Sequence, residues 1–242
     1  MPESPPGTNP PKCNMKHTRN RQQSHARSSQ LRIVGGTWRS RKFPVADVEG
    51  LRPTPDRVRE MLFNWLTGRI SGARCLDAFS GTGALGLEAL SRGASEVVFL
   101  EYSLEAAQTL KSTLKTLCSD ARVEQTDALQ WLSRPARHTF DLVFLDPPFR
   151  KQLLQPACEH LQANGWLAQD ALVYVEAENR LGPLLPVPAN WERFKEKITG
   201  QVISCLYRVG QDFRPEYFTT GTRPGYFTNK KDTNKKNPRT SD

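Results

Sequence analysis

The stretch at residues 75–86 constrains the fold most strongly, because an apolar run leads there into a glycine-rich turn and then into a second apolar run. It reads C-L-D-A-F-S-G-T-G-A-L-G. The pattern predicts a strand over residues 74–79, a turn that holds Gly81 and Gly83, and a helix over about residues 84–92. Glycines at such a turn let the backbone approach a ligand closely, and the start of the helix favours electron-rich groups. This turn is therefore a candidate ligand site.

Predicted strands and helices alternate after this turn. Apolar runs predict strands at residues 95–101, 122–125, 140–145 and 171–178, separated by predicted helices at 103–117, 128–132 and 151–163. Such strands are typical of a parallel sheet that helices cover on both faces. Residues 191–209 instead alternate in polarity around Thr199-Gly200, which predicts an antiparallel hairpin that closes the sheet. In this class of α/β fold, ligands bind beyond the carboxyl ends of the strands.

Composition and charge divide the chain into four parts. We expect basic disordered tails at 1–30 and 211–242, a hairpin followed by a helix at 31–70, and the sheet domain at 71–210. The tails carry net charges of +4 and +3, which leaves +2 of the total +9 for residues 31–210. Flexible basic segments suit a polyanion such as nucleic acid, although the same composition also serves a tail that only aids solubility.

Residues 31–45 contain two short strand-like runs on either side of Gly35-Gly36, which predicts the hairpin. The helix that follows is expected to have Thr54 as its N-cap and a buried stripe of Val58, Met61, Leu62, Trp65 and Leu66. Basic and aromatic side chains are interleaved in this region, and Arg59 lies mostly off the stripe. The candidates for contact with RNA are Arg32, Trp38, Arg39, Arg41, Lys42, Arg52 and Arg57. The alternative is a hairpin packed on the domain by Trp38 and Phe43, with solvated arginines.

Cysteine and histidine spacing argues against a metal centre. The five cysteines are widely spaced and the four histidines cluster with none of them, so we expect neither a disulfide framework nor a metal site. No apolar run approaches 18 residues and no signal peptide is recognisable. We therefore expect a cytoplasmic protein without a membrane partner, and we expect a monomer.

Acidic residues at the ends of the first three predicted strands point to a cofactor with an adenosine part. Asp77 precedes the glycine turn, Glu101 can accept hydrogen bonds from both ribose hydroxyls, and Asp127 can accept one from an adenine amino group. The candidate cofactor-binding residues are Asp77, Phe79, Gly81, Gly83, Glu101, Tyr102, Asp127 and Ala128. Each acid alone also fits a plain strand end or helix cap, and the spacing of the glycines fits a dinucleotide fingerprint as well.

The sequence Asp146-Pro147-Pro148-Phe149 is the most specific motif in the chain. It follows the apolar run F-D-L-V-F-L, which places it at the carboxyl end of a strand. An exocyclic purine amine is a poor nucleophile, and methylating it requires acceptors for both of its N–H groups. The Asp146 carboxylate and the Pro147 carbonyl can supply these acceptors, with both prolines fixing the turn and Phe149 stacking on a flipped base. The four residues are the candidate catalytic residues, and the alternative is a proline-rich turn with a buried aromatic side chain.

Together these motifs resemble a class I S-adenosylmethionine-dependent amino-methyltransferase. More narrowly, G-G-T-W-R-S-R-K-F-P-V, G-L-R-P-T-P-D-R-V-R-E-M-L-F-N-W-L and N-W-E-R-F-K-E-K-I-T-G-Q-V resemble the ribosomal RNA small-subunit methyltransferase D family, over residues 31–210. The resemblance implies a Rossmann-like seven-stranded sheet of order 3-2-1-4-5-7-6 with strand seven antiparallel. It also implies S-adenosylmethionine as cofactor and methylation of a guanine N2 in 16S ribosomal RNA, within the small ribosomal subunit.

Other functions remain compatible with parts of this pattern. A DNA adenine-N6 methyltransferase would share the Asp146 turn, because the same acceptors fit the amine of adenine. A glutamine methyltransferase would share the chemistry, although such enzymes usually carry Asn at the position of Asp146. A non-catalytic RNA-binding Rossmann module would not require the complete Asp146–Phe149 turn. A nicotinamide dehydrogenase is disfavoured because no His or Lys stands at a predicted strand end.

Overall fold

The computed structural model describes residues 30–181 and 185–210. The predicted tails lie outside these residues, except for Gln30, which begins the first strand instead of ending a tail. In chain order the elements are β1 (Gln30–Arg32), β2 (Lys42–Pro44), α1 (Asp56–Trp65), β3 (Arg74–Asp77), α2 (Ala84–Ser91), β4 (Glu96–Glu101), α3 (Leu104–Thr116), β5 (Arg122–Gln125), α4 (Ala128–Leu132), β6 (Phe140–Leu145), α5 (Leu154–Ala163), β7 (Leu167–Glu178), the 3-10 turn η1 (Asn179–Leu181), β8 (Trp191–Thr199) and β9 (Val202–Val209).

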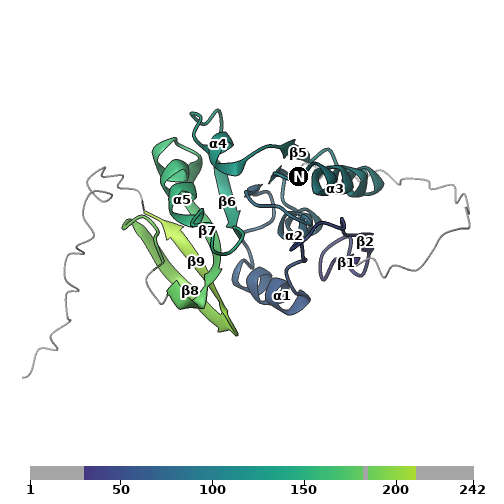
Figure 1. Cartoon of the computed structure of the whole chain (residues 1–242), viewed down its shortest axis with the longest axis horizontal. Helices are drawn as coiled ribbons and strands as arrows, with labels where there is room; N and C mark the ends of the chain where they lie inside the picture. Colours follow the sequence, from purple (N-terminus) through teal and green to yellow (C-terminus); the bar gives the residue numbers. More distant parts are fainter. Residues whose placement is uncertain (1–29, 182–184, 211–242) are drawn as a thin grey trace, which may run out of the picture.

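A seven-stranded sheet forms the centre of the molecule (Figure 1). Its order is β5-β4-β3-β6-β7-β9-β8. The five strands from β3 to β7 run parallel, and β9 runs antiparallel to both β7 and β8. Counted from β3, this is the predicted order 3-2-1-4-5-7-6 with strand seven antiparallel. The class I methyltransferase topology is therefore confirmed.

Two hydrophobic clusters cover the two faces of the sheet, as the apolar strands predicted. One cluster contains residues of α1, α2 and α3 together with buried side chains of β3 and β4. The other contains residues of α4 and α5. Leu31, Ile33, Phe43 and Val45 of the N-terminal segment are buried in the first cluster, so the β1–β2 hairpin packs on the sheet domain.

Several predicted boundaries are wrong by a few residues. The helix expected at 151–163 begins at Leu154, because Arg150 and Gln152 adopt left-handed φ values of 65° and 53° that no helix accommodates. Strand β7 begins at Leu167, four residues before its predicted start. Helix α1 has Pro55 as its N-cap and no side-chain cap, so Thr54 does not have the predicted capping role.

The buried face of α1 also differs from the predicted stripe. Arg59, Leu62 and Phe63 of the helix are buried, as is Leu66 just beyond it. Val58, Met61 and Trp65 are only half-buried. The helix is thus rotated relative to the predicted stripe, and this rotation turns Arg59 into the interior instead of toward solvent.

A hydrogen-bonded network around Glu88 of α2 explains how a buried arginine is tolerated. Glu88 is fully buried and its Oε2 atom accepts hydrogen bonds from Arg59 Nη1 at 3.2 Å and from the backbone N–H of Val34 at 3.0 Å. Its Oε1 atom accepts one from Arg92 Nε at 2.9 Å. Arg59 Nη2 donates to the Arg32 carbonyl at 2.7 Å. The network therefore joins the hairpin, α1 and α2 through fully paired charges.

We expect the variant Arg59→Met to lower the free energy of unfolding by about 3–5 kcal/mol, because it leaves the Glu88 carboxylate buried with an incomplete set of donors. Urea denaturation followed by circular dichroism measures this change. The matched control is Arg57→Met, at an exposed position on the same helix, for which we expect a change below about 0.5 kcal/mol. Equal effects of the two substitutions would show that the ion pair does not stabilise the fold.

Candidate cofactor and substrate site

The predicted site residues meet at the carboxyl edge of the sheet. Because β5, β4, β3, β6 and β7 are parallel neighbours, the segments that follow them emerge on one side. These are the glycine turn after β3, the Glu101 loop after β4, the Asp127 loop after β5 and the Asp146 turn after β6. The structure thus brings together the acids that the sequence singled out.

Asp77 is a buried carboxylate at the end of β3, with 2% of its surface exposed. Its Oδ2 atom accepts a hydrogen bond from the backbone N–H of Gly86 at 3.0 Å, in the first turn of α2. Burial raises the pKa of Asp77 to about 7, against the stabilising effect of that bond and with a further contribution from the charge of Glu101. This carboxylate therefore favours a proton or a cationic neighbour.

Glu101 at the end of β4 holds two loops of the edge together. Its Oε2 atom accepts from the N–H of Gly81 and its Oε1 atom from the N–H of Ser103, both at 2.7 Å. Burial raises the pKa of Glu101 although these N–H groups oppose the shift. Next to it, Tyr102 is 75% exposed, and Phe79 is partly buried against the second hydrophobic cluster.

The turn between β3 and α2 requires its glycines for two different reasons. Gly81 and Gly83 adopt positive φ values of 53° and 75°, in the left-handed region that side chains disfavour. Gly86 has no such backbone constraint, but a Cβ atom there would lie 2.2 Å from the ring of Phe99. The first two glycines shape the turn, and the third lets α2 pack directly on β4.

Asp127 is exposed and caps α4, since its Oδ1 atom accepts from the N–H of Gln130 at 2.9 Å. The capping role that the sequence left open is thus present, and the adenine contact of Asp127 stays a prediction. The neighbouring Ala128 is buried at the first position of α4.

The Asp146–Phe149 turn borders a pocket of about 330 Å³. Pro147 is buried, Asp146 is half-buried and the ring of Phe149 is 43% exposed. Burial raises the pKa of Asp146 well above its ordinary value, with further contributions from the charges of Glu176 and Asp77. The turn therefore offers an aromatic face on the wall of an open pocket and, at its first residue, a carboxylate that readily holds a proton.

Glu176 of β7 lines this candidate site and is bonded to Tyr174, and the sequence analysis singled out neither residue. Glu176 is 6% exposed, lines the same pocket, and accepts a hydrogen bond from the hydroxyl of Tyr174 at 2.6 Å. Burial raises the pKa of Glu176 as well. The only signal in the sequence is a single acid inside the apolar run A-L-V-Y-V-E-A.

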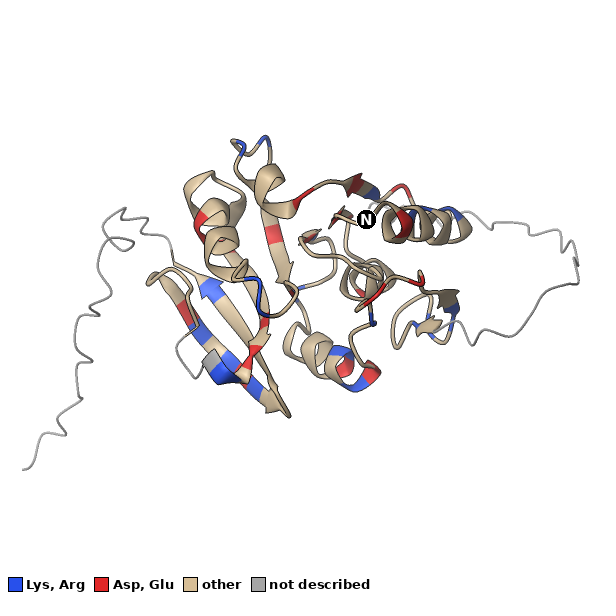
Figure 2. Ribbon diagram, in the orientation of Figure 1, with Lys and Arg blue, Asp and Glu red and all other residues tan. Residues whose placement is uncertain are grey.

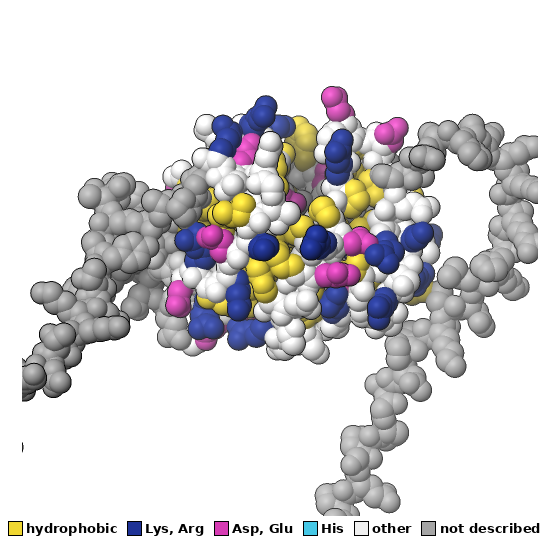
Figure 3. Space-filling model, turned by 90° about the horizontal axis from the view of Figure 1, so that it is seen from below, with side chains coloured by type: hydrophobic (Ala, Val, Ile, Leu, Met, Phe, Trp, Pro, Cys, Tyr) yellow, Lys and Arg dark blue, Asp and Glu magenta, His cyan; other side chains and the backbone are white. Residues whose placement is uncertain are grey.

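The basic residues predicted to contact RNA are mostly exposed. Arg39, Lys42, Arg52 and Arg57 are exposed, and Arg41 lies over the ring of Phe43 at 5.5 Å. Arg32 is exposed but paired with Asp56 at 2.5 Å. Figure 2 shows Lys and Arg at the hairpin, at the start of α1 and along β8. Seen from below, Lys and Arg side chains are spread around apolar surface (Figure 3).

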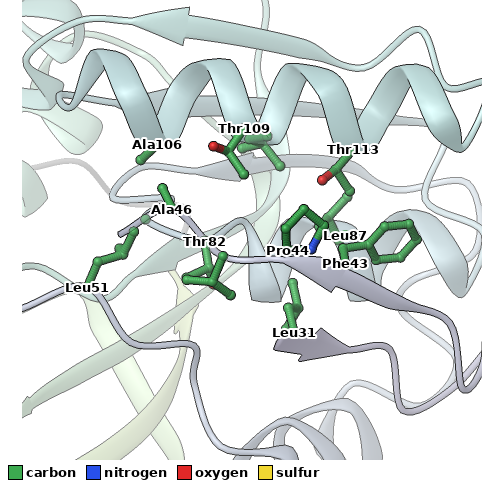
Figure 4. A pocket seen from close by; sticks show the side chains of 13 residues that line it. Leu31, Phe43, Pro44, Ala46, Leu51, Thr82, Leu87, Ala106, Thr109 and Thr113 are labelled. Atoms are coloured by element: carbon green, nitrogen blue, oxygen red, sulfur yellow. The ribbon is translucent and has the colours of Figure 1, made fainter. Parts of the chain in front are cut away.

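The aromatic residues of the hairpin pack on the domain, as the alternative interpretation predicted. Phe43 is buried and Trp38 is partly buried against the same cluster. Between the hairpin and α3 there remains a crevice of about 10 Å³, in which Leu31, Pro44 and Leu87 face Thr109 and Thr113 (Figure 4). That volume holds about one water molecule, so this contact is a packed joint. Stacking of Trp38 on RNA stays a prediction.

The described part of the chain contains neither a group of metal ligands nor a membrane-spanning helix. Over residues 30–181 and 185–210, no three His, Cys, Asp or Glu side chains are grouped in a way that could hold a metal ion. Within the same residues, no helix combines the length and apolarity needed to cross a membrane.

Known proteins with similar sequences fit this geometry. The family model described as "Conserved hypothetical protein 95" matches residues 31–208. The relative named "Ribosomal RNA small subunit methyltransferase D" from Escherichia coli K12 is 50% identical over 186 residues, which are 76% of this chain and 93% of the relative. The protein of the same name from Haemophilus influenzae is 49% identical over 183 residues, which are 74% of this chain and 94% of that protein. The chain belongs to the ribosomal RNA small subunit methyltransferase D family.

Solved structures agree with this family assignment. The Escherichia coli protein named "Putative methyltransferase yhhF" superposes with a TM-score of 0.72 at 47% identity, over 76% of this chain and 100% of that one. The predicted resemblance is thus confirmed, and the fold is that of a class I methyltransferase. In this chain the buried carboxylates described above lie at the carboxyl edge of the sheet, which is where such folds bind ligands.

We expect the raised pKa of Asp77 to make the fold less stable as the pH rises. The carboxyl pKa is about 7 in the folded chain and 3.8 ordinarily. The contribution of this proton to stability is therefore fully present below pH 3.8, and it is lost as the pH rises through 7. Relative to Asp77→Asn, which does not titrate, the wild-type free energy of unfolding should fall by up to about 4 kcal/mol between pH 4 and 8. Urea titrations at several pH values measure the difference, and parallel curves for the two proteins would contradict it.

Proposed function

We propose that this chain transfers a methyl group from S-adenosylmethionine to the exocyclic N2 of a guanine in 16S ribosomal RNA, within the small ribosomal subunit. The observation that carries the proposal is the Asp146–Phe149 turn, which stands at the end of β6 beside the glycine turn of β3. The names of the relatives from Escherichia coli and Haemophilus influenzae support ribosomal RNA of the small subunit as the substrate.

The residues of the edge suit S-adenosylmethionine, which supplies a methyl group on a positively charged sulfur. The buried Asp77 favours a cationic neighbour, and the left-handed turn at Gly81 and Gly83 lets backbone approach the ligand without side chains. Glu101 has free lone pairs for ribose hydroxyls beyond its two backbone bonds, and the exposed ring of Tyr102 can cover an adenine. We propose that Phe79, Asp127 and Ala128 also contact S-adenosylmethionine.

The proposed chemistry is a direct displacement. Guanine N2 forms a bond to the methyl carbon as the carbon–sulfur bond breaks, and N2 then releases a proton. Asp146 and the Pro147 carbonyl accept the two N–H groups of the amine and orient its lone pair, while Phe149 stacks on the base. Because the pKa of Asp146 is raised by burial and by Glu176 and Asp77, this carboxylate is suited to take the released proton and pass it to water.

The test is transfer of labelled methyl from S-adenosylmethionine to unmodified small subunits, to naked 16S RNA and to duplex DNA, followed by nucleoside digestion. We expect N2-methylguanosine from the small subunits. Asp146→Ala should lower turnover at least 100-fold while S-adenosylmethionine still binds, because only the amine contacts are lost. The control Asp120→Ala changes an exposed acid away from the edge and should be as active as wild type.

Three results would redirect the assignment. N6-methyladenine from DNA would keep the fold and cofactor but replace the substrate. Label in no nucleic acid would point to a protein substrate or a non-catalytic RNA-binding role. Normal turnover by Asp146→Ala would remove this turn from the mechanism.

The exposed cations of the N-terminal segment are proposed to contact RNA phosphates. We expect Arg39→Ala and Lys42→Ala each to reduce by about one the slope of log affinity for small subunits against log salt concentration. The control Arg134→Ala changes an exposed arginine in the segment between α4 and β6, outside the N-terminal segment, and should leave the slope unchanged. Binding measured by filter retention at several salt concentrations separates these results, and equal slopes for all variants would exclude the hairpin from the RNA interface.

A further inference from the structure

Two buried polar residues of β7, Tyr174 and Glu176, make no contact with the base in the chemistry described so far. The pairing of Leu145 with Val175 puts Asp146 and Glu176 at the next matched positions of the neighbouring parallel strands β6 and β7. Side chains at matched positions of adjacent strands lie on the same face of the sheet. The charge of Glu176 acts directly on Asp146, in agreement with this placement. The edge therefore presents two carboxylates side by side.

Glu176 lines the pocket that borders the turn after β6. It lines the pocket with Pro147, Pro148 and Phe149, and its Oε1 atom is occupied by the hydroxyl of Tyr174. Its second oxygen has no hydrogen-bond partner in the residues the structure describes. In the same residues, the fully buried side-chain atoms without a hydrogen-bond partner are His138 Nε2 and Asn190 Nδ2. The second oxygen of Glu176 is not one of them, so it is not fully enclosed. Within the described residues, a residue that lines the pocket thus keeps one carboxylate oxygen without a donor.

A carboxylate in this position requires a donor. Burying an acid without a partner is costly, and two adjacent acids repel one another unless N–H or O–H groups lie between them. Tyr174 supplies one such group. The ligand must supply the others, and it must carry them next to each other in order to reach Asp146 and Glu176 at once.

Guanine carries such neighbouring donors, whereas adenine does not. The N1–H of guanine lies beside its N2 amine, so an acceptor next to Asp146 can bind N1–H while Asp146 binds the amine. The corresponding N1 of adenine is an acceptor, which would place a lone pair against the oxygen of Glu176. The pair of carboxylates therefore selects between the two purines, which the amine contacts of Asp146 and Pro147 do not.

We propose that Glu176 is the specificity-determining residue for guanine, accepting a hydrogen bond from N1–H while Asp146 accepts from the N2 amine, and that Tyr174 positions the Glu176 carboxylate. The inference rests on the proposed guanine-N2 function. Glu176 on β7 would thus recognise the base together with the four residues of the turn after β6. Ser204, buried at the position of β9 that pairs with Glu176, completes the polar surroundings of this carboxylate.

The experiment uses 2-aminopurine, which keeps the amine that accepts the methyl group but has a lone pair in place of N1–H. Small subunits are reconstituted with 16S RNA that carries either guanosine or 2-aminopurine at the methylated position, which is first mapped by sequencing of labelled fragments of the RNA. The kcat/KM ratio of guanosine over 2-aminopurine is the readout, because a purely structural defect lowers both rates together. For the wild-type enzyme we expect a ratio of roughly 10 to 100.

Glu176→Gln should lower this ratio at least tenfold, because the amide can turn an N–H group toward the lone pair of 2-aminopurine. Tyr174→Phe should lower it in the same direction and by less, since the carboxylate remains but loses its orienting bond. The matched control Glu196→Gln, an exposed acid of β8 paired with Arg193, should leave the ratio unchanged. Binding of S-adenosylmethionine should be unaffected in all three variants.

The outcomes separate this inference from the function on which it rests. An unchanged ratio in Glu176→Gln, with guanosine methylated by the wild type, overturns only the role of Glu176. A wild-type ratio near one overturns it as well, and this result remains decisive if Glu176→Gln does not fold. Failure of the wild type to methylate guanosine in subunits overturns the proposed function and this inference together.

Discussion

The position of the hairpin and α1 on the sheet domain depends on the hydrogen bonds and ion pairs that the buried carboxylate of Glu88 makes. The hairpin and α1 have too little apolar surface to fold separately, and they dock on α2 around this one charge. Helix α2 also begins at the glycine turn and donates the Gly86 N–H to Asp77. A single ion-pair network therefore sets the cations of the N-terminal segment in a fixed position relative to the carboxyl edge of the sheet.

At that edge, four carboxylates are held in surroundings that favour their protonated forms. The pKa values of Asp77, Glu101, Asp146 and Glu176 are all raised by burial. A structural core would avoid such a group of acids, because each one costs stability when it ionises. Raised pKa values of several neighbouring residues are typical of functional sites, where a ligand supplies the missing donors and positive charge.

Much of the site could be predicted because its residues lie in continuous motifs. In the glycine turn and in the Asp146 turn, an apolar strand is followed by glycines or prolines that end it. The position of each turn at the end of a strand therefore follows from the local sequence pattern. Helix α1 shows where this reasoning ends: its apolar residues fit more than one stripe, and the observed stripe depends on Glu88, which is 29 residues away from Arg59. Glu176 was missed for a similar reason, since its place beside Asp146 depends on the register between β6 and β7.

By itself, the sequence determined the order of strands and helices, the antiparallel end of the sheet and the acids that follow the first four parallel strands, because these depend on short-range periodicity and turn chemistry. Only the tertiary structure decided which charges are buried and which carboxylates stand side by side. Burial depends on packing between distant segments, and the pairing of Asp146 with Glu176 depends on the register between β6 and β7. A shift of one residue in that register would turn Glu176 to the opposite face of the sheet and away from the pocket.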